Sequence, residues 1–286
     1  MSTSSQELAG RTFLITGANT GIGRVTALRL AERGATLTLA GRSEERTRPV
    51  LDEIARGGGK ASFLQLDLGD LANVRASALR YLDSGAPLDV LVNNAGLAGQ
   101  RGLTKDGFEL TFGTNHLGPF LFTLLLLPLI QKGKEPRIVN VASRAHKRTD
   151  GIDWDALRKP TRTVSGFPEY AVSKLCNILF TREMAREKAG AGVHNYSLHP
   201  GAVATDIYRR LPWPITSILR LFLITEEEGA KTQIWCATSP EVASDNGLYY
   251  SECKVKEPTK LAQDDALAKR LWEVSEEMVG AHLKSS

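Results

Sequence analysis

A tyrosine and a lysine in the stretch EYAVSK are spaced for proton chemistry. Tyr170 and Lys174 stand four residues apart, so on a helix both side chains would lie on one face. Free tyrosine ionises near pH ~10, and a neighbouring ammonium group favours its phenolate form. Such a pair could work as a general acid and base at neutral pH. The spacing alone is more often structural than catalytic, so other residues have to decide between the two interpretations.

A glycine-rich turn gives the second chemical signal. TGANTGIG (16–23) follows an apolar run and opens an amphipathic one, with glycines at Gly17, Gly21 and Gly23. Glycine permits a tight turn and the close approach of a phosphate, and a helix N-terminus offers free N–H groups to it. The spacing differs from the G-x-G-x-x-G fingerprint. In its strand–turn–helix setting the turn predicts a nucleotide phosphate site, and the alternative is a plain glycine-rich turn.

The end of the next apolar run bears on which nucleotide binds. TLTLAGR (36–42) ends at Arg42, and the nearest acidic residues, Glu44 and Glu45, come later. In sites of this kind an acidic side chain holds the ribose hydroxyls of NAD, whereas an arginine accommodates the 2′-phosphate of NADP. We therefore expect NADP(H) as the cofactor; the alternative is that Arg42 is only a solvated charge.

These residues need a scaffold that brings strand ends together. Apolar runs predict buried strands at 11–17, 36–42, 61–68, 89–96, 137–143, 193–201 and 247–251. Helical patterns occupy 21–34, 43–58, 70–85 and 169–192. The alternation predicts the α/β class, with a doubly wound Rossmann domain, a parallel sheet of about seven strands and helices on both faces. We expect a single domain over 1–286 with an ordered core at 8–280, and ligands outside the carboxyl ends of the strands.

Composition argues against several other classes. The 286 residues carry a formal net charge of +4, and their basic clusters are short and lack interleaved aromatics, so no nucleic-acid partner is expected. Cys176, Cys236 and Cys253 are far apart and lack metal-ligand spacing. They predict reduced thiols in a reducing, cytoplasmic setting rather than a disulfide framework or a zinc site.

No stretch has the length expected of a membrane span. The N-terminal MSTSSQELAG has no apolar region, so we expect no secretory signal. The longest apolar runs, 120–130 and 214–224, fall short of the roughly 18 residues of a spanning helix. We expect the first to be a buried helix and the second to be a substrate lid or a peripheral membrane contact.

The order of the motifs resembles a known family. TGANTGIG, NNAG, TNHLG, NVAS, YAVSK and HPGAVAT occur in the order and rough spacing of the short-chain dehydrogenase/reductase family, over nearly the whole chain. Longer stretches such as SGFPEYAVSKLCNILFTREMA and GLYYSECK resemble its retinol-dehydrogenase-like branch, as does the long insertion between Ser143 and Tyr170. Members of that branch often have an N-terminal membrane anchor, and none is expected here.

The resemblance implies a role for each matching residue. Tyr170 would be the general acid/base, and Lys174 would bind the nicotinamide ribose and lower the pKa of Tyr170. Ser143 would hold the substrate oxygen, and Asn115 would help organise a water that relays the proton. Besides Tyr170 and Lys174, the cofactor contacts would be Gly17, Asn19, Thr20, Gly21, Ile22 and Gly23 at the pyrophosphate, Arg42, Asp67 and Leu68 at the adenosine, Asn94, Ala95 and Gly96 at its ribose, and Pro200, Gly201, Val203 and Thr205 at the nicotinamide.

Some of these residues also have structural interpretations. Ser143 alone could be a helix cap, and Asn115 alone could be a buried amide. His116, His146 and His199 lack metal-ligand spacing, and we expect them to be structural or solvated.

The expected function is NADP(H)-dependent hydride transfer to or from a carbonyl/alcohol pair of a hydrophobic small molecule. Substrate contacts are expected from 97–103, 144–168 and 202–224, and the last of these segments lies in a substrate-loop region at 202–228. The last segment is rich in apolar and aromatic residues, which favours a retinoid, a lipid-derived aldehyde or a bulky ketone. Family members often pair as dimers, which implies a possible homodimer through helices near 107–132 and 168–188.

Two other functions remain open on the same fold. One is a non-catalytic NADP(H)-binding sensor or interaction protein, because fold does not dictate function. The other is an epimerase or dehydratase, which also uses a Tyr/Lys pair but usually has a differently spaced glycine turn and a longer chain.

Overall fold

The described chain forms a single continuous sheet. We analysed a computed structural model, which describes residues 6–201 and 224–283. The strands are ordered β3-β2-β1-β4-β5-β6-β7-β8. Their bounds are β1 Thr12–Thr16, β2 Thr36–Gly41, β3 Lys60–Gln65, β4 Val90–Asn93, β5 Arg137–Val141, β6 His194–His199, β7 Leu248–Ser251 and β8 Lys254–Val255. Because β4 lies beside β1, the strand order reverses there and opens the crevice where such sheets bind ligands.

The seven predicted strands are confirmed and run parallel, and an eighth is added. β8 pairs antiparallel with β7 through Val255 and Lys254. Glu252 and Cys253 connect the two strands, and both have positive φ, at 58° and 53°. A two-residue strand after a turn without glycine carries no alternation that the sequence could reveal.

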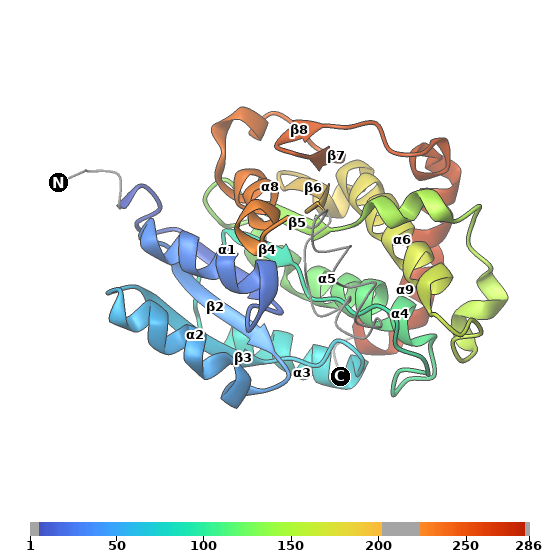
Figure 1. Ribbon diagram of the computed structural model, residues 1–286, viewed down its shortest axis with the longest axis horizontal. Coiled ribbons are helices and arrows are strands. Elements are labelled where there is room, and N and C mark those ends of the chain that lie inside the picture. Colours follow the sequence, from blue (N-terminus) through green and yellow to red (C-terminus); the bar gives the residue numbers. More distant parts are fainter. Residues whose placement is uncertain (1–5, 202–223, 284–286) are drawn as a thin grey trace.

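Helices cover both faces of the sheet (Figure 1). Helices α1 Gly21–Glu32, α2 Glu44–Arg56 and α8 Glu226–Thr238 pack on one face, around buried Phe13, Ile15 and Leu39. The other face packs against α3 Leu71–Asp83, α5 Gly118–Ile130, α6 Phe167–Arg186 and α9 Asp265–Leu283. The four helices expected from the sequence are thus confirmed as α1, α2, α3 and α6. The single-domain organisation remains a proposal that one continuous sheet favours.

The apolar run at 120–130 is a buried helix, as expected. Phe120, Leu121 and Phe122 in α5 are fully buried. The helical stretch Leu110–Ile130 is long and apolar enough to cross a membrane by composition, yet most of it lies inside the protein. Its first part is α4 Leu110–Phe112, followed by a π-helical turn, η2 Gly113–Leu117.

The C-terminal helix α9 covers the helices through which a dimer was expected. The Trp272 ring lies 5.1 Å from Phe120 of α5 and 5.9 Å from Phe180 of α6, between ring centroids. His116 Nε2 is 2.9 Å from Ser275 Oγ of α9. A homodimer through α5 and α6 therefore remains a proposal, and it would have to use the surface that α9 leaves uncovered.

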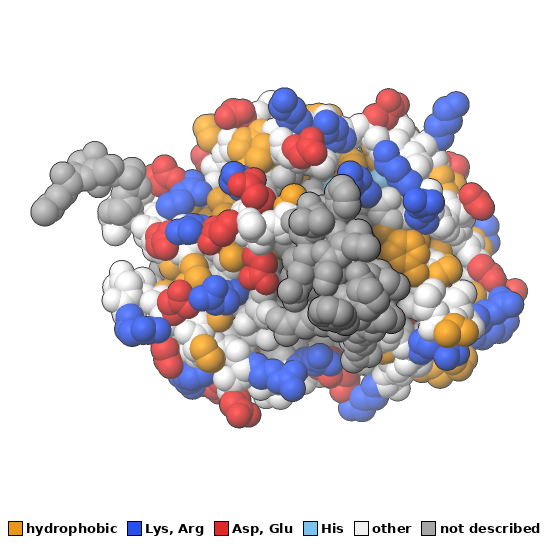
Figure 2. Space-filling model, in the orientation of Figure 1, with side chains coloured by type: hydrophobic (Ala, Val, Ile, Leu, Met, Phe, Trp, Pro, Cys, Tyr) orange, Lys and Arg blue, Asp and Glu red, His pale blue; other side chains and the backbone are white. Residues whose placement is uncertain are grey.

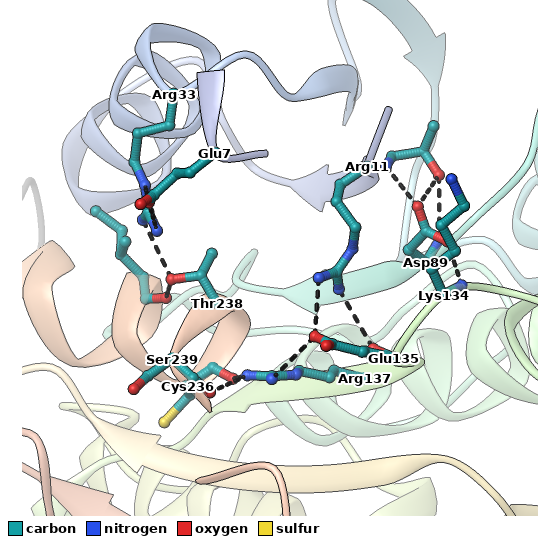
Figure 3. Close-up of polar contacts among 12 residues, drawn as sticks. Glu7, Arg11, Arg33, Asp89, Lys134, Glu135, Arg137, Cys236, Thr238 and Ser239 are labelled. Carbon is teal, nitrogen blue, oxygen red and sulfur yellow. Dashed lines mark hydrogen bonds and ion pairs between the residues drawn. The ribbon is translucent and has the colours of Figure 1, made fainter. Parts of the chain in front are cut away.

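Charged side chains are paired at the amino edge of the sheet, where the strands begin (Figure 3). The buried Asp89 carboxylate accepts hydrogen bonds from Thr12 N at 2.7 Å and Lys134 N at 2.5 Å. Arg137, only 1% exposed, donates to the carbonyl oxygens of Cys236 and Ser239. These contacts join β1, β5 and α8 at the edge opposite the predicted ligand site.

Candidate active site

The glycine turn packs tightly against the segment that follows β4. Gly17 has φ 68°, and a Cβ there would lie 2.9 Å from Ala95 Cα. A Cβ on Gly23 would lie 2.4 Å from Asn94 Nδ2. In return Asn94 Nδ2 donates to Thr16 O at 2.8 Å and to Gly17 O at 3.1 Å. The turn and the NNAG segment therefore form one rigid unit in which these glycines cannot be replaced without displacement.

The start of α1 is open to an anion. Thr20 is its N-cap and makes no side-chain cap bond, and the first turn has no acidic residue. The first N–H groups of a helix have no intrahelical partner and carry partial positive charge. The turn that holds Asn19, Gly21 and Ile22 therefore fits the pyrophosphate of a dinucleotide.

The Tyr170–Lys174 pair lies near the start of α6, one helical turn apart. Lys174 is 4% exposed, and its Nζ donates to Val141 O at 2.7 Å. Its Nζ is 5.6 Å from the centroid of the Tyr170 ring. Burial lowers the pKa of Lys174 to about 8, so the ammonium form still predominates at pH 7. The structure thus places a buried cation beside the tyrosine ring at the carboxyl edge of the sheet.

Asn115 and Gly96 border the lysine. A Cβ on Gly96 would lie 3.2 Å from Asn115 Oδ1 and 3.4 Å from Lys174 Nζ. Asn115 sits in the π-helical turn, where its Oδ1 accepts from Leu97 N and its Nδ2 donates to Leu97 O and to Ser173 Oγ. Its amide therefore fixes the loop after β4 to α6. The water-organising role of Asn115 remains a prediction.

Ser143 follows β5 and caps a short helix, as its structural interpretation proposed. Its Oγ accepts a hydrogen bond from Ala145 N at 3.1 Å at the start of η3 Arg144–Arg148. A hydroxyl that accepts there still has its proton to donate. Capping and substrate binding by Ser143 are therefore compatible.

The other predicted cofactor residues also lie after strand ends. Arg42 follows β2, is exposed, and makes no hydrogen bond or ion pair with any described residue. Asp67 follows β3 and accepts from Gly69 N at 3.0 Å, next to the buried Leu68. Pro200 and Gly201 follow β6, with Gly201 at φ 96°. Val203 and Thr205 lie outside the described residues.

Asn177 is a site residue that the motifs did not point to. Its Nδ2 donates at 3.2 Å to Val141 O, the same carbonyl that accepts from Lys174. The residue stands three positions after Lys174 on the same face of α6, and that spacing was the available signal. Asn177 and Lys174 together fix the end of β5, two residues before Ser143.

A cavity of about 330 Å³ opens beside Gly201. Its described lining is largely polar and of mixed charge: Arg144, Pro200, Gly201, Ile224, Glu228, Lys231, Thr232, Glu252 and Cys253. Arg144, which lines this space, donates from Nε to His199 Nε2 at 2.7 Å. The residue directly after Ser143 therefore contributes a positive charge next to the predicted nicotinamide end.

The buried histidines do not form a metal site within the described ranges. No group of three or more His, Cys, Asp or Glu side chains there is arranged to hold a metal ion. Burial lowers the pKa of His116 to about 3 and that of His199 to about 4. Both are therefore neutral at physiological pH. The three cysteines are free thiols, as expected.

Similarity to known proteins covers nearly the whole chain. A model of the short chain dehydrogenase family matches residues 11–154. Dehydrogenase/reductase SDR family member 13 of Bos taurus is 41% identical over 284 residues, which cover 96% of this chain and 74% of that protein. Retinol dehydrogenase 14 of Homo sapiens is 40% identical over 293 residues, which cover 95% of this chain and 87% of that protein.

A solved structure shows the same architecture. An uncharacterized protein from Mycobacterium paratuberculosis superposes with a TM-score of 0.77 at 32% identity, over 96% of this chain and 95% of the other. The glycine-rich turn and the Tyr/Lys pair thus occur in a chain that matches dehydrogenases over nearly its whole length. The chain belongs to the short-chain dehydrogenase/reductase family, in its retinol-dehydrogenase-like branch, and is an oxidoreductase of the kind that uses a nicotinamide cofactor.

Proposed function

We propose that the protein is an NADP(H)-dependent oxidoreductase that interconverts a hydrophobic aldehyde or ketone and its alcohol. The observation that carries the proposal is the buried Lys174 ammonium group, 5.6 Å from the Tyr170 ring at the carboxyl edge. A buried lysine with one neutral hydrogen-bond partner is costly to the fold. A bound ribose and an adjacent phenolate would both offset that cost, because each supplies an acceptor for the Lys174 ammonium group.

In the proposed reaction the protein moves a proton and the cofactor supplies the hydride. For carbonyl reduction Tyr170 donates its phenolic proton to the substrate oxygen as negative charge develops there. Lys174 lowers the free energy of the phenolate that remains, because opposite charges attract strongly in a partly dry cleft. Ser143, whose Oγ accepts from Ala145 N, donates its own hydrogen to the same oxygen. Alcohol oxidation reverses these steps.

Arg42 supports the preference for NADP(H). It stands at the carboxyl end of β2 and has no partner among the described residues. The nearby Glu44 forms an ion pair with Arg48 along α2. An unpaired guanidinium group at this place matches a 2′-phosphate bidentately.

Apolar side chains beside the site support a hydrophobic substrate. Leu103, Val164 and Phe167 are among the few large hydrophobic side chains exposed in the described chain, and Val164 is 87% exposed. Their two loops are joined where Gly102 N donates to Thr161 Oγ1 at 3.1 Å. The Phe167 ring lies 6.0 Å from that of Tyr170. Relatives named retinol dehydrogenases support the same substrate class.

The remaining partner assignments are also proposals. Lys and Arg side chains alternate with Asp and Glu over the described surface in Figure 2, so this face has no continuous basic surface of the kind that binds nucleic acid. A cytoplasmic location, a peripheral membrane contact and a homodimer are further parts of the proposal.

The direct test is a substrate panel. Purified protein is mixed with NADPH or NADH and with retinal, medium-chain aldehydes and bulky ketones, while cofactor oxidation is followed by absorbance and cofactor binding by fluorescence. We expect turnover with NADPH and at least one apolar carbonyl. Tight NADPH binding with no turnover on any substrate would instead favour a non-catalytic sensor.

A further inference from the structure

His146 is buried between Ser143 and the C-terminal segment. Its side chain is 0% exposed. Its ring makes an edge-to-face contact with Tyr249 of β7, with 5.3 Å between the ring centroids. The Nδ1 atom lies 2.6 Å from Ser143 O, and the Nε2 atom lies 3.4 Å from Thr259 N. One imidazole ring therefore bridges two segments that are 113 residues apart.

The two partners specify one form of the ring. Ser143 O can only accept, so Nδ1 carries the hydrogen. Thr259 N–H can only donate, so Nε2 must be the unprotonated nitrogen. Burial also lowers the pKa of His146, which keeps this neutral tautomer in place. The ring thus donates toward Ser143 and accepts from the C-terminal segment.

His146 closes the turn that fixes Ser143. The carbonyl oxygen of Ser143 accepts from His146 N at 3.2 Å as well as from the ring. The backbone of Ser143 is extended, at φ −163° and ψ 155°, and its Oγ points back to Ala145 N. On the other side of the strand end, Lys174 and Asn177 hold Val141 O. Hydrogen bonds therefore hold the backbone around Ser143 at two points: α6 binds Val141 O, and His146 binds Ser143 O.

We propose that His146 is a positioning residue for the reaction, and that its Nδ1–H bond to the Ser143 carbonyl holds the serine hydroxyl in place for the substrate oxygen. This inference rests on the proposed function. A displacement of about 1 Å at a reacting group can cost about 10²-fold in rate. Loss of the bond therefore lowers kcat and leaves cofactor affinity unchanged.

Three substitutions of His146 distinguish the loss of this hydrogen bond from the loss of side-chain volume. In His146→Asn the amide nitrogen lies where Nδ1 was and still donates to Ser143 O. In His146→Gln the amide reaches the position of Nε2 instead, and in His146→Leu the volume remains without a donor. We expect kcat to stay within about fivefold of wild type in His146→Asn and to fall about 10²-fold in the other two. The matched control is His194→Asn at the amino edge, which is expected to keep wild-type kcat.

A double-mutant cycle with Ser143→Ala gives the second readout. If His146 acts through the serine, His146→Leu causes no further loss of kcat in the Ser143→Ala background, because the group that it positions is gone. Additive losses would overturn the inference. So would equal losses in His146→Asn and His146→Leu, or a fall in NADPH affinity with unchanged kcat.

Thermal unfolding and NADPH binding are measured for every variant. If His146→Leu does not fold, the comparison of His146→Asn with His146→Gln decides the question alone. A wild-type protein that turns over no carbonyl would overturn the proposed function and this inference with it. If the wild-type protein turns over a carbonyl substrate but the losses of kcat in the double-mutant cycle are additive, only the inference about His146 is overturned.

Discussion

The two edges of the sheet use buried charge in opposite ways. At the amino edge the Asp89 carboxylate accepts three hydrogen bonds, from Thr12 N, Thr12 Oγ1 and Lys134 N. Arg137 donates to two carbonyl oxygens, and its Nη2 lies 3.5 Å from the Glu135 carboxylate (Figure 3). The same carboxylate forms an ion pair with Arg11. These hydrogen bonds offset part of the desolvation cost of the buried charges, although burial still lowers the pKa of Arg137.

At the carboxyl edge the buried charge is left poorly compensated. Among the described residues the Lys174 ammonium group, with three donors, has a single hydrogen-bond acceptor, Val141 O. Burial lowers its pKa to about 8. We infer that the amino edge stabilises the sheet, whereas the carboxyl edge keeps a buried cation for a ligand at a cost in stability.

The largest expected effect is on turnover, at the carboxyl edge. Tyr170→Phe removes the proposed acid/base, so kcat should fall about 10³-fold while NADPH binding, followed by fluorescence titration, stays within a few-fold of wild type. Tyr81→Phe is the control, because its hydroxyl donates to Pro87 O beyond the end of α3 and is not a predicted site group. Substantial turnover by Tyr170→Phe would remove the tyrosine from the mechanism.

The largest expected effect on stability is at the amino edge. Arg137→Met removes the buried guanidinium group that donates to the carbonyl oxygens of Cys236 and Ser239, so the free energy of unfolding should fall by about 3 kcal/mol. Urea denaturation measures this loss. The KM for NADPH should not change, since the edge lies away from the site. A stable variant with altered KM would contradict the separation of the two edges.

Removing the buried charge at the carboxyl edge is expected to raise the free energy of unfolding, whereas removing Arg137 lowers it. Lys174→Met should abolish turnover yet raise the free energy of unfolding of the cofactor-free protein by roughly 2 kcal/mol at pH 7. The folded pKa of about 8 lies below the ordinary 10.5, so between these pH values the unfolded chain holds more protons and wild-type stability rises with pH. The variant should lack that rise. A destabilised Lys174→Met would show that the lysine is a structural group.

A smaller effect is expected at the cofactor end. Arg42→Gln removes the proposed 2′-phosphate contact, so kcat/KM with NADPH should fall about tenfold, or 1.4 kcal/mol, and kcat/KM with NADH should change little. Arg56→Gln, at the far end of α2, is the control and should leave both values unchanged. An equal fall with both cofactors would mean that Arg42 does not select between them.

The sequence predicted the sheet because buried parallel strands are continuous apolar runs between glycine turns. The run DVLVNNAG, for example, contains β4 Val90–Asn93. The helices α1, α2, α3 and α6 were predicted by periodicity and end residues. The helix α9 was not among the helices expected from the sequence, and its packing on Phe120 and Phe180 depends on tertiary contact.

The candidate site was predicted only in part, for a related reason. Motifs identified Tyr170 and Lys174, and the structure places their side chains together. Residues that act through long-range contacts have no local pattern. Asn177 meets Val141 from 36 positions away, and His146 meets Thr259 from 113 away. Sequence spacing can align a helical face, but it cannot show which distant carbonyl or amide that face will meet.

We propose that a bound nicotinamide supplies hydride to a carbonyl carbon at the carboxyl edge while Tyr170 supplies the proton. The most direct measurement uses NADPH deuterated at C4 on either face, an apolar aldehyde, and mass spectrometry of the product. We expect one deuterium at the carbinol carbon of the alcohol from one of the two labelled cofactors, and none with Tyr170→Phe over the same time. An alcohol without deuterium from both cofactors, or no alcohol at all from a protein that binds NADPH, would contradict it.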